Sequence, residues 1–164
     1  MTDGGACQHW PTGRAVFLNT ARTFVVWVGE EDHLRIISMQ QGGDLAAVYT
    51  RLGKAMAILD SRLEFARTDK LGYLTFCPSN LGTTMRASVH IRLPGLNRRG
   101  ELGKLAAQAG LQVRGTGGEH TSTVAGVVDI SNIRRMGVTE RQLVTEMFKR
   151  VQEIIGAENK LEKT

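Results

Sequence analysis

The sequence has few of the residues that mark specialised classes of protein. Aromatic residues make up only 5% of its 164 residues, too few for the base-stacking surfaces that bind single-stranded nucleic acids. Its two cysteines, Cys7 and Cys77, can form at most one bridge and do not make the disulfide framework of a small secreted protein. No apolar run approaches the roughly 20 residues of a membrane-spanning helix. We therefore expect a cytoplasmic chain with reduced thiols and no membrane partner.

Positive charge is in excess, but the basic residues are spread along the chain. The formal net charge is +5, which suits an anionic partner such as a nucleotide, a nucleic acid or an acidic lipid. No block of five or more like charges occurs, so the sequence does not indicate a nucleic-acid-binding tail. Basic residues are not clustered with aromatic ones, which makes nucleic acid the weakest of these candidates. The composition, 41% hydrophobic and 23% charged, is that of one globular domain over residues 1–164.

The hydrophobic pattern predicts an α+β domain. Apolar or alternating runs predict strands at residues 14–19, 23–28, 34–39, 73–76, 86–93, 111–113 and 124–130. Apolar residues three and four apart predict helices at residues 45–63, 95–110 and beyond 139. Because short turns join several strands, we expect an antiparallel sheet with helices packed on one face. We treat residues 65–70 as a polar connection and assign to the core the stripe Leu45, Val48, Leu52, Met56, Leu59 and Leu63.

Two features predict how the helices begin. Asp44 is a good N-cap for the first predicted helix, since its carboxylate can accept a backbone N–H of the first turn. Thr139-Glu140-Arg141-Gln142 has the spacing of a capping box.

The stretch from Cys77 to Leu93 combines a turn with a clear alternation of polar and apolar residues. Cys77-Pro78-Ser79-Asn80 is typical of a turn, because Pro fixes one backbone angle and Ser and Asn bond their own backbone. The next residues predict a strand with an apolar face and a polar face, the polar face holding Arg86, Ser88, His90 and Arg92. Periodicity alone favours a solvated sheet face here.

Other charged residues fall beside predicted strands. Glu30-Glu31-Asp32 is either a charged turn or the source of one carboxylate that binds a cation while Arg35 binds an anion. The loop from Arg114 to Glu119 is rich in glycine, which lets backbone N–H groups approach an anion, but it lacks the lysine of a P-loop. Arginines near one sheet face, with carboxylates and a cysteine around them, suit phosphoryl transfer from a nucleotide to a guanidinium.

Six stretches carry a resemblance to a known family. They are Ala6-Cys7 with Trp10-Pro11-Thr12-Gly13-Arg14, residues 23–27 with residues 30–40, Cys77-Pro78-Ser79-Asn80-Leu81-Gly82-Thr83, residues 86–91, residues 114–116 with 118–120, and Asp129-Ile130-Ser131-Asn132. With them the sequence resembles the C-terminal catalytic domain of the phosphagen (ATP:guanidino) kinases, most closely the arginine kinases. The Cys-Pro-Ser/Thr-Asn-Leu-Gly motif is highly specific for that family, and the resemblance covers nearly all of the chain.

The resemblance implies reversible transfer of the ATP γ-phosphoryl group to L-arginine. Glu31 and Glu119 would pair with the guanidinium, one of them as base, and Cys77 would lie beside it as a thiolate. Arg35, Arg86 and Arg114 would clamp the phosphates, His90 would lie near the adenine and Asp129 near the ribose. The residues that would line the ATP or ADP are Arg35, Arg86, Ala87, Ser88, Val89, His90, Arg114, Gly115, Thr116, Gly117, Gly118 and Asp129. Mg²⁺ would be held mainly by phosphates and water, since no carboxylates are spaced as a metal cage.

The sequence also departs from the family pattern. Family members are about twice as long, so we expect that the N-terminal phosphagen-selecting domain and an upstream Ser-Arg-x-Arg motif are absent. Gly117 stands where arginine kinases are expected to have Arg, which removes a cation from the loop. A nucleotide-binding or regulatory domain with little activity is therefore the alternative to an active kinase. The sequence does not set the oligomeric state.

Overall fold

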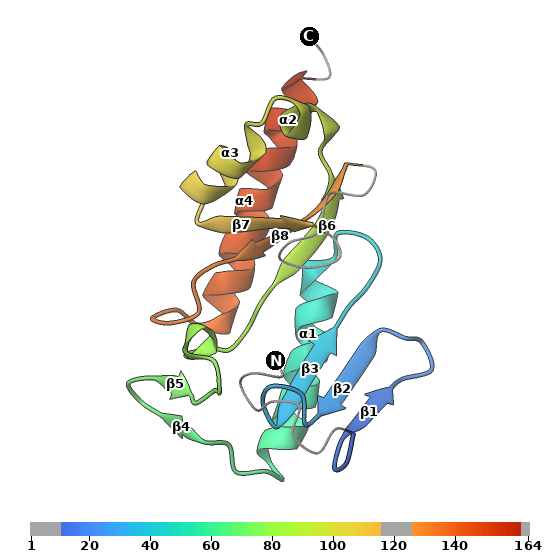
Figure 1. Ribbon diagram of the computed structural model, residues 1–164, viewed down its shortest axis with the longest axis vertical. Coiled ribbons are helices and arrows are strands. Elements are labelled where there is room, and N and C mark those ends of the chain that lie inside the picture. The colour runs from blue at the N-terminus through green and yellow to red at the C-terminus, as the bar shows by residue number, and fades with distance from the viewer. Residues whose placement is uncertain (1–10, 116–125, 162–164) are drawn as a thin grey trace. The chain divides into compact units, whose positions relative to one another are not determined.

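A computed structural model describes residues 11–115 and 126–161 (Figure 1). Its contacts divide the chain into two compact units, Met1–Leu81 and Gly82–Thr164, which are described one at a time. Both contain antiparallel strands and helices, which confirms the predicted α+β class. The described strands pair in two three-stranded sheets and one two-stranded sheet.

The first unit is built on a three-stranded sheet. Its strands β1 (Ala15–Leu18), β2 (Phe24–Val28) and β3 (Leu34–Ser38) pair antiparallel, with β2 in the centre as its apolar run predicts. Helix α1 (Leu45–Asp60) follows and packs on β3. Its start confirms the predicted N-cap, since Asp44 Oδ1 accepts the N–H of Ala47 at 2.9 Å.

The sequence predicts that the apolar stripe of α1 is part of a buried core, and this prediction is wrong. None of its residues is buried, and Leu63 lies beyond the end of the helix at 45% exposure. Helix α1 packs mainly on β3, which is an edge strand, so the sheet covers only part of the stripe. The polar connection predicted at 65–70 is also wrong in part, because β4 (Arg67–Thr68) pairs with β5 (Gly72–Tyr73) there. The turn after Cys77 is the 3₁₀ helix η1 (Pro78–Asn80).

The second unit has a sheet with a buried apolar face. Its strands are β6 (Ser88–Arg92), β7 (Leu111–Gly115) and β8 (Val127–Asn132), with β8 between the other two. Helix α4 (Glu140–Leu161) packs on β8 and contacts α2 (Pro94–Arg98). The core formed in this way comprises Leu93, Leu96, Leu102, Ala106, Leu111, Val128, Ile130, Leu143, Met147, Val151 and Ile154.

The predicted helix over 95–110 is broken into two. α2 ends at Arg98 and α3 (Leu102–Gln108) begins after Gly100, whose φ of +69° is a left-handed conformation that ends a helix. The capping box is confirmed, since Gln142 N–H donates to Thr139 Oγ1 and Thr139 N–H donates to Gln142 Oε1. Within the described ranges, no helix has both the length and the apolar character needed to cross a membrane.

Candidate nucleotide and guanidinium sites

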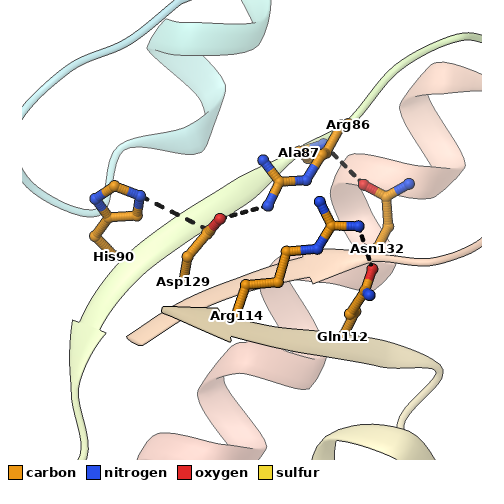
Figure 2. A network of polar contacts seen from close by, with 7 residues as sticks. All are labelled: Arg86, Ala87, His90, Gln112, Arg114, Asp129 and Asn132. Atoms are coloured by element: carbon orange, nitrogen blue, oxygen red, sulfur yellow. Dashed lines mark hydrogen bonds and ion pairs between the residues drawn. The ribbon is translucent and has the colours of Figure 1, made fainter. Parts of the chain in front are cut away.

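A row of charged side chains crosses the sheet of the second unit. Asp129 on β8 lies opposite His90 on β6 and opposite Arg114 on β7. Directly opposed residues in a sheet point to the same face, so these three side chains share one face (Figure 2). The flanking residues Val128 and Ile130 point to the other face and are fully buried. Asp129 is thus in the middle of its strand, whereas the sequence predicts it near the end.

Asp129 is the centre of this polar face. Its side chain is only 8% exposed and accepts an ion-paired hydrogen bond from Arg86 Nη2 through Oδ2. His90 Nε2 lies 3.8 Å from the other oxygen, Oδ1, with a side chain that is 59% exposed. Arg114 directs Nη2 to Gln112 Oε1 at 2.9 Å. One buried carboxylate therefore stands among two guanidinium groups and an imidazole, and basic groups outnumber it (Figure 2).

Two buried oxygens on this face lack hydrogen-bond partners. Within the described part of the chain, neither Asp129 Oδ1 nor Ser131 Oγ has one. Ser131 lies in the next row of the same face, opposite Ser88 and Gln112. Buried polar atoms of native proteins are nearly always hydrogen-bonded to protein, water or ligand. The excess of basic groups on this face suits an anionic molecule.

Asn132 holds the segment that carries Arg86. It is 7% exposed, and its Oδ1 accepts the N–H of Ala87 at 2.8 Å. Its Nδ2 donates to the carbonyl oxygens of Met85 at 3.2 Å and Arg134 at 2.8 Å. Both the oxygen and the nitrogen of the amide bond to backbone, so the residue fixes the path of residues 85–87. Sequence reasoning missed this role, because the only signal for it was a polar residue at the end of an apolar strand.

The acidic turn of the first unit has a different contact for each carboxylate. Glu30 Oε1 accepts from Arg35 Nη1 at 3.0 Å, with the Glu30 side chain only 8% exposed. Asp32 Oδ1 accepts the N–H of Phe76 at 2.7 Å. No hydrogen bond or ion pair joins the Glu31 side chain to any residue in the described ranges. Of the three acids, Glu31 is therefore the one left to bind another molecule.

Cys77 lies at the start of a hydrogen-bonded turn. It is a free thiol, and its Sγ is 3.0 Å from Ser79 Oγ. Its carbonyl oxygen accepts from Thr75 Oγ1 at 2.8 Å and from the N–H of Asn80 at 3.0 Å. The half-exposed thiol is thus fixed by its own turn, within reach of solvent.

The predicted site residues fall into separate groups. Arg86, His90, Arg114 and Asp129 lie together in the second unit. Arg35 is on β3 of the first unit, where it is ion-paired with Glu30.

The remaining predicted residues complete this account. Ala87, Ser88 and Val89 are half-buried in or beside β6, and Gly115 is buried at the end of β7. Thr116, Gly117, Gly118 and Glu119 lie outside the described residues. Over the described ranges, no three His, Cys, Asp or Glu side chains are grouped to hold a metal ion.

Known proteins with similar sequences are ATP:guanido phosphotransferases. The family model for the ATP:guanido phosphotransferase C-terminal catalytic domain matches residues 4–161. An arginine kinase of Limulus polyphemus is 59% identical over 159 residues, which cover 96% of this chain and 44% of that protein. An arginine kinase of Artemia franciscana is 58% identical over 154 residues, or 93% of this chain and 43% of that protein. The chain thus spans less than half the length of these relatives.

The solved structures that resemble this chain are also kinases of guanidino compounds. A taurocyamine kinase of Schistosoma mansoni with bound transition-state analogue components matches 99% of this chain and 23% of its own, with a TM-score of 0.92 and 49% identity. A lombricine kinase matches 95% of this chain and 44% of its own, with a TM-score of 0.89 and 41% identity. At these identities, the similarity extends beyond the fold.

Proposed function

Because the chain belongs to the family of ATP:guanido phosphotransferase C-terminal catalytic domains, we propose that residues 1–164 form the catalytic domain of an arginine kinase-like enzyme. The reaction transfers the γ-phosphoryl group of ATP to a guanidinium nitrogen of L-arginine, reversibly. L-arginine is the proposed acceptor because the relatives at 58–59% identity are arginine kinases. A cytoplasmic location, expected from the sequence, is part of the same proposal.

The observation that carries this proposal is the row of basic groups around Asp129. Arg86 and Arg114 can each present two N–H groups to phosphate oxygens, a geometry that lysine cannot match. His90 is exposed at the edge of the row, where a base or sugar can contact it. The face thus suits a nucleotide, with phosphates at the arginines and the nucleoside toward His90.

The guanidinium is proposed to bind between carboxylates and the thiol of Cys77. A planar cation with five N–H donors is best bound by ionised oxygens and by thiolate. Glu31 is the acid of its turn that is not already hydrogen-bonded to a described residue. Glu119 is assigned the same task from the family resemblance. Arg35, paired with Glu30, is proposed to reach the phosphates as the third clamping arginine.

The chemistry needs positioning and charge neutralisation more than a covalent nucleophile. A guanidinium nitrogen attacks the γ-phosphorus, and the bond from that phosphorus to the bridging oxygen breaks. ADP leaves with the bonding electrons, and Glu31 or Glu119 takes the proton that the nitrogen loses. Arginines around the phosphates stabilise the charge on the transferred group. Mg²⁺ is proposed to arrive with ATP, held by phosphates and water, and to neutralise the same charge.

A direct assay tests the proposal. The chain is incubated with Mg²⁺, ATP and L-arginine, and phosphoarginine is followed by phosphorus NMR, with ATP binding measured separately by calorimetry. Production of phosphoarginine supports the enzyme. ATP binding without product supports the alternative, a nucleotide-binding or regulatory domain. Parallel reactions with taurocyamine and lombricine, the guanidines named in the structural relatives, test the choice of acceptor.

A further inference from the structure

One hydrogen bond joins the two segments of the first unit that carry Glu31 and Cys77. Asp32 Oδ1 accepts the backbone N–H of Phe76 at 2.7 Å, across 44 residues of sequence. Glu31 and Cys77 each lie one residue from this bond, about 3.8 Å along the backbone between Cα atoms. The bond therefore sets how far apart the carboxylate of Glu31 and the thiol of Cys77 can be.

Packing does little to hold this segment in place. Phe76 is 61% exposed and Leu74 is 45% exposed, so neither large apolar side chain anchors it through burial. The Asp32 contact is a short hydrogen bond to a carboxylate, a type roughly twice as strong as a neutral one. The position of the segment that contains Phe76 therefore depends on its hydrogen bond to Asp32.

The Cys77 turn is held together by its own hydrogen bonds. Thr75 Oγ1 and the N–H of Asn80 both donate to the Cys77 carbonyl oxygen. Because Phe76 lies within this bonded stretch, a shift of Phe76 moves Cys77 with it. On the other side, Glu30 is paired with Arg35, which steadies the turn that carries Glu31.

We propose that Asp32 is a positioning residue for the guanidinium site. Its carboxylate does not touch the substrate; it holds the Cys77 turn at the distance from Glu31 that a guanidinium requires. The proposal rests on the guanidinium site described under the proposed function.

The test measures protection of Cys77 by L-arginine. Alkylation of the peptide that contains Cys77 is followed by mass spectrometry, so that Cys7 does not interfere, over a range of L-arginine concentrations. In Asp32→Ala, the concentration for half-protection should rise by about tenfold, which is the usual effect of losing one hydrogen bond to a charged group. ATP affinity should stay within about twofold of the unmodified chain, because Arg86 and Arg114, on which the proposed phosphate site depends most, lie on other segments than those that Asp32 joins.

Two variants serve as controls. Asp32→Asn keeps an acceptor oxygen at the same position and should restore most of the protection. Asp44→Ala removes a comparable contact in the same unit, the 2.9 Å hydrogen bond to the N–H of Ala47, and should leave protection unchanged. Protection of Asp32→Ala equal to that of the unmodified chain would overturn the proposal.

Hydrogen exchange keeps the two proposals separable and does not require a folded alanine variant. The Phe76 amide of the unmodified chain should exchange slowly, and exchange at the rate of an open amide would overturn the role of Asp32. A slowly exchanging Phe76 amide, together with no protection of Cys77 by L-arginine, would instead overturn the guanidinium assignment of Glu31 and Cys77.

Discussion

The two units of the chain hold their functional residues by different means. In the second unit, the charged row lies on a sheet whose other face is a buried core that includes Val128 and Ile130, both at 0% exposure. In the first unit, none of the residues from 11 to 81 is fully buried. Its elements are joined by polar contacts such as Arg51 to the carbonyl oxygen of Met39 and Asp32 to Phe76. The proposed nucleotide face is therefore supported by packing, and the proposed guanidinium site by hydrogen bonds.

The largest effect of a single substitution is expected in the core behind the proposed nucleotide face. Ile130→Ala removes a fully buried side chain next to Asp129 and should lower the free energy of unfolding by about 2–5 kcal/mol through the cavity that it leaves. Val16→Ala on β1, where Val16 is 63% exposed, should cost less than about 0.5 kcal/mol. Urea unfolding of both variants measures the difference. Equal losses would contradict the contrast between the units.

Two carboxylates that accept backbone N–H groups at a helix start, one buried and one exposed, can be compared by their contribution to stability. Glu158 on α4 is 4% exposed and accepts the N–H groups of Gly95 at 2.6 Å and Leu96 at 2.8 Å, at the start of α2. Its replacement by alanine leaves two N–H groups of the interior unpaired and should cost about 2–4 kcal/mol. Asp44→Ala removes the exposed cap of α1 and should cost about 1 kcal/mol.

The same urea titrations measure both helix-start variants. Glu158→Gln should recover part of the loss, because its side-chain oxygen still accepts one hydrogen bond. A loss for Glu158→Ala no greater than that for Asp44→Ala would show that burial does not strengthen the Glu158 contact.

Nucleotide affinity tests the assignment of the charged row. Arg86→Ala removes a charge-assisted phosphate contact of about 1.5–3 kcal/mol and should weaken ATP binding by roughly tenfold to a hundredfold. Arg92→Ala is the control, since Arg92 is an exposed arginine of the same strand β6 that is not assigned to the site. Calorimetric titration with ATP measures both. Equal affinities for the two variants would remove Arg86 from the phosphate site.

The sequence predicted local features better than their assembly. The cap at Asp44, the capping box at Thr139 and the central position of β2 follow from local chemistry or from an uninterrupted apolar run. The break after Arg98 depends on whether Gly100 takes a left-handed conformation, which a glycine permits but does not require.

Contacts between distant segments were beyond sequence reasoning. The bonds from Asn132 to residues 85–87, from Asp32 to Phe76 and from Glu158 to Gly95 join residues 44 to 63 positions apart. No periodic pattern records such pairs. Residue types predicted which side chains are functional candidates, while the roles of the residues that hold them appear only once the fold brings them together.

The smallest expected change in stability comes from relieving backbone strain at Thr84, close to Arg86 in the sequence. Thr84 has a φ of +55°, a left-handed conformation that is a genuine outlier for a β-branched residue. It persists between two fixed points: Thr83 N–H donates to the Arg135 carbonyl oxygen at 3.0 Å, and Asn132 holds residues 85–87. Thr84→Asn should therefore stabilise the chain by about 0.5–1 kcal/mol, because asparagine adopts this conformation at lower cost.

Arg22, at a φ of 52° in the turn between β1 and β2, gives the comparison in the first unit. It is not β-branched, so Arg22→Asn should gain less than Thr84→Asn when both are unfolded in urea. If the strain at Thr84 instead helps to aim Arg86, the gain in stability of Thr84→Asn will be accompanied by weaker ATP binding. That result would make the residue part of the nucleotide site, whereas unchanged affinity would confine its strain to the path of the chain.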